Sequence, residues 1–250
     1  MQYLGVKSQI ARRLAAILEA ERSPGGRFVE PFAGAWNVTA AMGSHGPRLA
    51  NDACQPLVTL AQAWLAGWRP PAEVSEDLYR ELKAKQDPAD PLTAFVGFGC
   101  AFGGKWFGGY ARGFVLPGTL IHASQAAGGT EPVNWAAQSE RGIERKLSRC
   151  VDVRFTCLDF GDLEILPGDL VYADPEYRGT TRYVYYKTPF DHDRFVATAQ
   201  GWAAIPGVKV FVSEYAAQSD TWEQVAEWPA RGKQLNASMS AERLFRVRPC

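Results

Sequence analysis

Several residue types that would indicate a particular function are scarce in this chain of 250 residues. It has 3 histidines, and its 5 cysteines are widely spaced without a CxxC pair. We therefore expect no metal site and no disulfide framework. Lys plus Arg and Asp plus Glu number 27 each, so the formal net charge is zero. A nucleic-acid partner would have to be met by a local basic patch.

Long apolar runs are missing as well. No stretch approaches the roughly 18 apolar residues that a membrane-spanning helix needs. No apolar run follows the early charge of residues 1–7, which argues against a signal peptide. A hydrophobic content of 46% and a charged content of 22% are those of an ordinary globular protein. We expect a cytoplasmic protein without a membrane partner, with either one large domain or one domain that carries an insert.

Short apolar segments alternate with amphipathic ones in the first and last parts of the chain. Strands are predicted at 28–31, 48–50, 153–158, 169–173, 208–212 and 243–247, and helices at 8–21, 36–43, 56–68, 139–149, 190–204 and 221–227. This alternation predicts an α/β fold with a Rossmann-like sheet. The pattern is lost over 69–138, which is too long for a structureless loop. Residues 1–68 and 139–250 are therefore predicted to form the main domain, and 69–138 an inserted, mostly helical and irregular subdomain.

Acids follow the predicted strands, where ligands bind in open α/β sheets. Gly34 lies in a turn, FxGxxN, that lacks the spacing of a pyrophosphate cradle and is equally compatible with a structural turn. Asp52 could accept the hydroxyls of a ribose or cap the next helix. Asp159, with Phe160 beside it, could hold an adenine or be a turn acid. An adenosine without a phosphate cradle fits S-adenosyl-L-methionine (SAM) better than NAD.

The tetrapeptide Asp174-Pro175-Glu176-Tyr177 ends another strand. Chemistry on the exocyclic amine of a base needs two hydrogen-bond acceptors and a stacking face. The Asp174 carboxylate and the Pro175 carbonyl could be the acceptors, because proline restrains the backbone. Tyr177 could be the platform for a base turned out of the duplex. These three residues are the predicted catalytic group.

These motifs together resemble those of Dam-like (D12 class) DNA N6-adenine methyltransferases. The resemblance is carried by FVEPFAGAWNV at 28–38, LAND at 49–52 and DPEY in place of DPPY, and GTTRY and ERLF are similar to the phage-type branch. It implies transfer of a methyl group from SAM to adenine in double-stranded DNA, in a bacterial or phage-infected cell. A restriction-modification role, with a restriction enzyme as partner, is left open. It also implies a cofactor pocket lined by Tyr3, Lys7, Glu30, Phe32, Gly34, Asp52, Asp159 and Phe160.

This sequence departs from the family pattern at two places. Trp36 and Asn37 replace a second small residue in the cofactor turn, and Glu176 replaces the second proline of the catalytic motif. Glu176 could face away from the pocket and be tolerated. It could also add negative charge beside Asp174 and weaken activity or DNA binding.

Residues expected to hold DNA combine cations, aromatic rings and glycine. They are Lys105, Trp106, Tyr110 and Arg112 in the loop 102–112, and Arg178 and Arg182 beside the catalytic motif. A glycine-rich structural loop is the alternative for 102–112. N4-cytosine methylation, a catalytically silent DNA-binding protein and an RNA or small-molecule methyltransferase remain alternative functions. We expect a monomer, with a dimer left open.

Overall fold

The computed structural model describes most of the chain and divides it into two compact units. The first unit comprises 1–6 and 55–148, and the second comprises 7–54 and 149–250. The residues described are Lys7, 10–115, 122–123, 131–179, Tyr185, 188–229 and 241–249. Within these ranges no helix is long and apolar enough to cross a bilayer.

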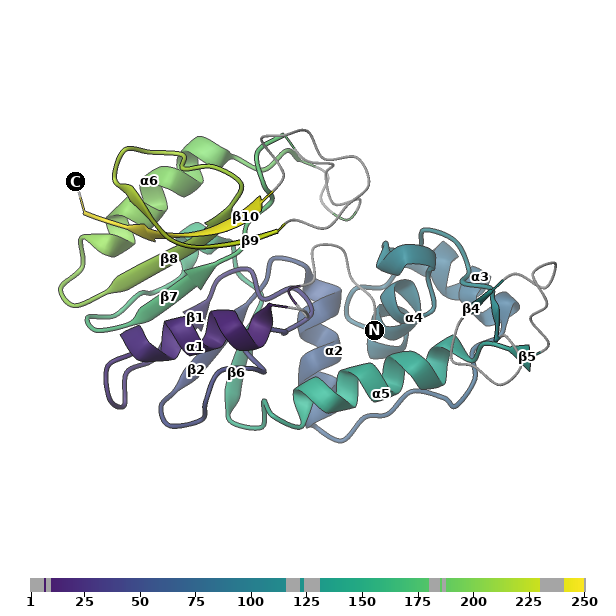
Figure 1. Ribbon diagram of the computed structural model, residues 1–250. Helices are drawn as coiled ribbons and strands as arrows, with labels where there is room; N and C mark the ends of the chain where they lie inside the picture. The colour runs from purple at the N-terminus through teal and green to yellow at the C-terminus, as the bar shows by residue number, and fades with distance from the viewer. Residues whose placement is uncertain are drawn as a thin grey trace. The chain divides into compact units, whose positions relative to one another are not determined.

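The second unit is built on a sheet of seven strands (Figure 1). Five neighbouring strands run parallel, whereas β10 is antiparallel to both β8 and β9. This arrangement confirms the predicted Rossmann-like α/β fold. In their order across the sheet the strands are β6 (Val153–Thr156), β2 (Arg48–Asn51), β1 (Phe28–Glu30), β7 (Leu170–Ala173), β8 (Lys209–Glu214), β10 (Ala241–Val247) and β9 (Trp222–Pro229).

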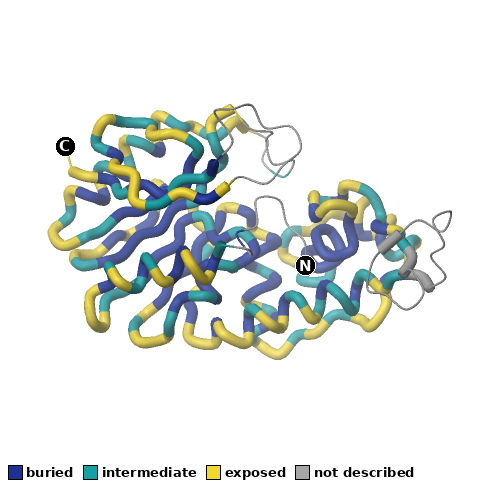
Figure 2. The backbone as a smooth tube through the Cα atoms, viewed as in Figure 1, coloured by how far each residue is buried: buried dark blue, intermediate teal, exposed yellow. Residues whose placement is uncertain are grey.

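Successive residues of the central strands supply two apolar layers, because side chains alternate between the faces of a sheet. Phe28, Tyr172 and Phe211 belong to a cluster that includes helix α1 (Ala11–Glu21). Their neighbours Val29, Val171 and Val210 belong to the opposite cluster, which includes helix α6 (His192–Ala203). The strands are therefore buried on both faces, as Figure 2 shows in dark blue.

Two predicted helices of this unit are not helices. Residues 36–43 form successive turns: Trp36 has a left-handed φ of 60°, and the Thr39 N–H donates to the Glu30 carboxylate. Residues 222–229 form the edge strand β9, paired along its length with β10. In both places a partner distant in the sequence overrides the local helical pattern.

The first unit is mainly helical. Its helices and short strands are α2 (Gln55–Leu65), α3 (Glu76–Lys85), α4 (Pro91–Gly99), the 3-10 helix η1 (Phe102–Gly104), α5 (Trp135–Leu147), β3 (Phe114–Val115), β4 (His122–Ala123) and β5 (Glu131–Pro132). Helices α3, α4 and α5 begin at side-chain caps from Ser75, Asp90 and Asn134. The small antiparallel sheet of β3, β4 and β5 was not predicted.

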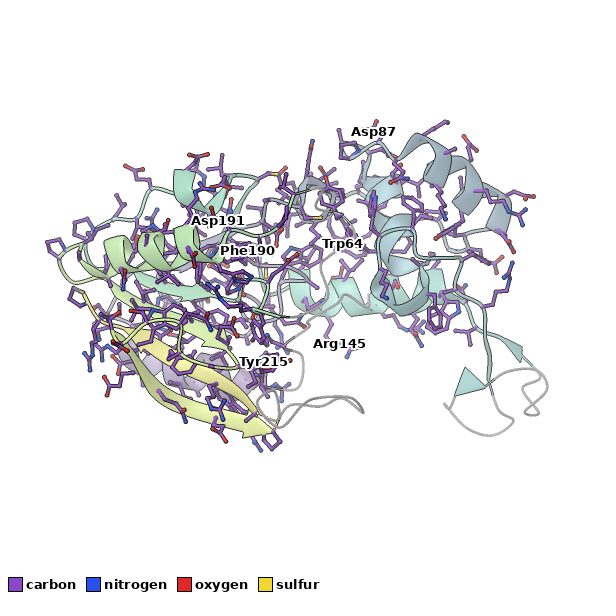
Figure 3. The ribbon with its side chains drawn as sticks, turned by 90° about the horizontal axis from the view of Figure 1, so that it is seen from above. Trp64, Asp87, Arg145, Phe190, Asp191 and Tyr215 are labelled. Atoms are coloured by element: carbon purple, nitrogen blue, oxygen red, sulfur yellow. The ribbon has the colours of Figure 1, made fainter. Side chains whose placement is uncertain are left out.

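The boundary of this unit differs from the predicted domain boundary. Helices α2 and α5 were assigned to the main domain by sequence, but they contact α4 and each other within the helical unit. The indole of Trp64 on α2, labelled in Figure 3, donates to Glu144 on α5 at 2.8 Å. The role of 69–138 in target recognition stays a prediction.

Candidate active site

Four acids follow the parallel strands of the second unit, as predicted. Glu30 ends β1, and Asp52, Asp159 and Asp174 follow β2, β6 and β7. Parallel strands bring their carboxyl ends to one edge of a sheet. Asp52 and Asp174 both act electrostatically on Glu30 and raise its pKa. The structure therefore brings these three acids together.

The turn after β1 is held by Asp52. Gly34 in this turn has a left-handed φ of 47°, a conformation that favours glycine. Its N–H donates to Asp52 Oδ2 at 2.8 Å, and the Cys54 N–H donates to Asp52 Oδ1 at 2.8 Å. The backbone therefore orients the Asp52 carboxylate, and its contact with a ribose stays a prediction.

Asn51, which sequence reasoning passed over, joins three segments beneath this turn. Its Nδ2 donates to the carbonyls of Pro31 and Leu158 at 3.0 Å each, and its Oδ1 accepts from the Leu158 N–H at 2.9 Å and the Thr156 hydroxyl at 2.9 Å. A buried amide with all its hydrogen bonds made is a strong local constraint. The only sequence feature that could have pointed to Asn51 was its place in the motif LAND at 49–52.

Glu30 is buried beside the segment that follows the cofactor turn and does not face solvent. Its side chain is buried and its Oε2 accepts from both the N–H and the hydroxyl of Thr39. Burial raises the pKa of Glu30 to about 8, against the lowering effect of Thr39, and the nearby Asp174 and Asp52 add to the rise. Its predicted contact with the cofactor stays a prediction.

Glu30→Gln is expected to change how stability depends on pH. The folded pKa is about 8 and the ordinary value is 4.5, so between these values the folded chain binds more protons than the unfolded chain. The free energy of unfolding therefore falls as pH rises from about 5 to 8. Glutamine does not titrate and still accepts from Thr39, so the variant should exceed the wild type at pH 8 by about 2–4 kcal/mol.

Urea unfolding at several pH values between 5 and 8 checks this expectation. The exposed Glu73→Gln is the matched control and should keep the wild-type slope. An unchanged slope in Glu30→Gln would show that Glu30 ionises normally in the folded chain.

Asp159 and Phe160 lie farther along the same edge. Asp159 is exposed, caps the short helix η3 (Phe160–Asp162) and pairs with Arg194 of α6. Although partial burial opposes it, the hydrogen bond from Arg194 lowers the pKa of Asp159. Phe160 is buried, and its ring contacts Phe32 at a centroid distance of 5.5 Å. The aromatic pair lies in the core cluster, and its predicted adenine contact stays a prediction.

The predicted catalytic residues surround a buried ammonium group. Lys7 Nζ lies 2.7 Å from Asp174 Oδ1, 3.2 Å from Glu242 Oε1 and 4.9 Å from the centre of the Tyr177 ring. Burial alone lowers the pKa of Lys7, but the carboxylates of Asp174 and Glu242 outweigh it and the pKa is raised. Pro175 is buried beside them. Lys7, predicted in the cofactor pocket, thus contacts the predicted catalytic carboxylate of Asp174.

Two acids of this site were not predicted. Glu242 at the start of β10 accepts from Lys7 and from the Tyr177 hydroxyl at 3.2 Å. Glu214, at the end of β8, accepts from the N–H groups of Arg178 and Tyr215. Tyr215, labelled in Figure 3, packs edge-on against Tyr177 with centroids 4.8 Å apart. Two sequence features could have pointed to these acids. Glu214 ends a predicted strand in VFVSEY (210–215), and Glu242 begins ERLF (242–245), which is similar to the phage-type branch of the family.

Most of the residues predicted to hold DNA in 102–112 have partners within the helical unit. The Trp106 indole donates to Gln86, the Tyr110 hydroxyl donates to the Val74 carbonyl, and Arg112 pairs with Glu76. Lys105 is exposed. Trp106 and Tyr110 therefore bind within the unit, which agrees with the alternative interpretation of this loop for these two residues.

The remaining predicted DNA contacts lie elsewhere. Arg178 is exposed and pairs with Asp193 of α6 at 2.7 Å. Arg182, and Tyr3 of the predicted cofactor pocket, lie outside the described residues. Among the residues described, no group of histidine, cysteine or acidic side chains could hold a metal ion.

Comparison with protein families agrees with the motifs. Residues 3–92 match the family model of D12 class N6 adenine-specific DNA methyltransferases. The matched stretch includes the cofactor turn and Asp52 but ends before the catalytic motif. The match over this part of the chain confirms the resemblance to Dam-like (D12 class) enzymes and supports a SAM-dependent methyltransferase.

Similar solved structures come from several organisms. One is yhhF from Escherichia coli, whose methyltransferase activity is inferred; it has 8% identity and a TM-score of 0.43, and the match covers 100% of this chain and 90% of that one. Another is the magnesium protoporphyrin IX methyltransferase ChlM from Synechocystis with bound SAM, with 10% identity, a TM-score of 0.38 and coverages of 96% and 79%. At these TM-scores the fold assignment rests on the strand order of the sheet itself.

The residues at this edge of the sheet fit SAM. Asp52 is oriented by two backbone N–H groups, and a carboxylate is the kind of acceptor that ribose hydroxyls bind. The carboxylates of Asp52 and Asp174 suit a ligand that carries positive charge at its sulfonium and amino groups. When bound, SAM supplies the methyl group.

Proposed function

We propose that this D12 class methyltransferase methylates the N6 amine of adenine in double-stranded DNA, on a base turned out of the duplex. The observation that carries the proposal is the placement of Asp174 against Tyr177 at the end of β7, with Pro175 buried between them. A carboxylate, a restrained carbonyl and an aromatic ring are the three contacts that an exocyclic amine on a flat base requires.

Asp174 supplies the charged acceptor. Its carboxylate accepts one N–H of the target amine, and the Pro175 carbonyl accepts the other, which draws the nitrogen lone pair out of the ring system. When the nitrogen lone pair forms its bond to the methyl carbon, the carbon–sulfur bond of SAM would break, with its electron pair going to the sulfur of the departing S-adenosylhomocysteine. Asp174 stabilises the positive charge that then develops on the nitrogen. The excess proton then leaves the amine for Asp174 or for water.

Tyr177 supplies the platform for the base. Its hydroxyl donates to Glu242, and its ring packs against Tyr215, so the ring is held from two sides. A fixed ring orients the base without loss of freedom at the moment of reaction, which is where positioning contributes to rate. The Glu214 carboxylate, which accepts from the backbone on either side of the site, restrains the same loop.

Glu176 lies near His192 at the start of α6, because its charge acts on the His192 pKa and opposes the lowering by burial and by Arg178. That the site tolerates Glu176 stays a prediction.

Methyl transfer from labelled SAM to duplex DNA tests the proposal. We expect label in a duplex that contains all four bases, none in an alternating G–C duplex, and N6-methyladenine after digestion. Label in the G–C duplex as N4-methylcytosine would overturn the choice of adenine. No transfer despite SAM and DNA binding would indicate a silent descendant, in which Glu176→Pro should restore activity.

A further inference from the structure

The ammonium of Lys7 occupies the two contacts that the target base needs in the proposed function. It binds the Asp174 oxygen at 2.7 Å, where the amine would donate. It also lies 4.9 Å from the centre of the Tyr177 ring, where the base would stack. Lys7 must therefore leave at least one of these positions before the base can bind.

Moving a buried ammonium costs much free energy if it loses its only partner. The Lys7 side chain is 9% exposed, so water cannot replace a lost carboxylate. Glu242 is the second carboxylate already in contact with it, at 3.2 Å. Glu242 reaches the site from β10, and its own side chain is 19% exposed. In the methyl-transfer steps described above, Glu242 serves only to hold the Tyr177 hydroxyl, which does not require a contact with Lys7.

We infer that Glu242 is a positioning residue that receives the Lys7 ammonium when the target amine takes its place on Asp174. The inference rests on the proposed function. Because Glu242 also accepts from the Tyr177 hydroxyl, the same carboxylate keeps the ring in place while Lys7 shifts. The ammonium stays paired in both positions, so base entry does not leave a buried charge alone.

Glu242→Gln tests this inference. Glutamine keeps an acceptor oxygen for Tyr177 but has no charge for Lys7, so Lys7 should remain on Asp174. We expect kcat/KM for DNA to fall by roughly 10- to 100-fold, chiefly through KM, because a charge-assisted hydrogen bond is lost at base entry. Glu242→Asp should recover part of the loss. Glu223→Gln on β9, exposed and paired with Arg248, is the matched control and should match the wild type.

A double-mutant cycle with Lys7→Met separates this role from a structural one. If Glu242 acts by receiving Lys7, Glu242→Gln should cost little more once Lys7 is already Met. The inference would be overturned if Glu242→Gln lowered kcat/KM for DNA by the same factor in the wild-type and Lys7→Met backgrounds, or did not lower it in the wild-type background.

A measurement that does not depend on catalysis distinguishes a failure of the Glu242 inference from a failure of the proposed function. Glu242 helps to raise the pKa of Lys7, so reductive methylation of Lys7 at pH 9, followed by mass spectrometry, should be faster in Glu242→Gln than in the wild type or Glu223→Gln. An unchanged rate would contradict the contact itself. The wild type could transfer no methyl group to DNA while reductive methylation of Lys7 is still faster in Glu242→Gln. That result would contradict the proposed function and support the contact between Lys7 and Glu242.

Discussion

Asp174→Asn is expected to reduce methyl transfer to DNA by about 100- to 1000-fold in kcat, the largest effect of any substitution considered for this chain. Asparagine has nearly the same shape and could still accept one hydrogen bond. It cannot stabilise the positive charge that develops on the target nitrogen, and its NH₂ group would face the donating amine. The loss should therefore appear in kcat and not only in the KM for DNA.

Single-turnover transfer from labelled SAM measures this effect without product release. Asp77→Asn on α3 is the matched control, because its side chain is 92% exposed in the helical unit. It should transfer at the wild-type rate. Near-normal transfer by Asp174→Asn would remove Asp174 from the chemistry and leave the Asp174–Lys7 pair with a structural role only.

Asp52→Asn is expected to weaken SAM binding by about 100-fold, the second large effect. The carboxylate accepts from Gly34 at one oxygen and from Cys54 at the other. Asparagine has a single acceptor oxygen, so its NH₂ group must oppose one of these two N–H groups. The cofactor turn then loses its support, and the ribose loses a charged acceptor worth about 1.5–3 kcal/mol.

Calorimetric titration with SAM checks this expectation in the absence of DNA, and Asp77→Asn again serves as the control. Urea unfolding of Asp52→Asn should show a loss of about 1–3 kcal/mol, since a backbone donor is left unpaired near a buried turn. Unchanged SAM affinity would make Asp52 the helix-capping residue of the alternative interpretation. Its hydrogen bonds with the Gly34 and Cys54 N–H groups would then have a structural role only.

The helical unit changes where DNA contacts should be sought. Trp106 and Tyr110 are engaged within the unit, whereas Lys105 is exposed and Phe102 is 71% exposed on the adjacent 3-10 helix. An exposed aromatic ring beside a lysine can stack on a base or lie against the backbone of a duplex. DNA contact by this loop therefore stays a prediction, and within it the exposed Phe102 joins the already predicted Lys105 as a candidate.

Local patterns in the sequence determined the sheet and its ligand-binding edge. Apolar runs such as 170–173 pack on both faces, which only a covered, largely parallel sheet allows, and each such strand is followed by an acid that reaches the carboxyl edge. Asp52 and Asp174 could thus be placed from their neighbours alone. The helix predicted at 190–204, which the structure places at 192–203, likewise depends on an amphipathic pattern and on the cap from Asp191.

Only the tertiary structure decided which distant groups meet at that edge. Lys7, Tyr177 and Glu242 come from three separate segments, and nothing in their immediate neighbours specifies a distance of about 3 Å between them. The turns at 36–43 and the strand at 222–229 depend in the same way on Glu30 and on β10. Local propensities differ by about 1 kcal/mol or less, whereas burial and pairing across the sheet contribute more and therefore prevail.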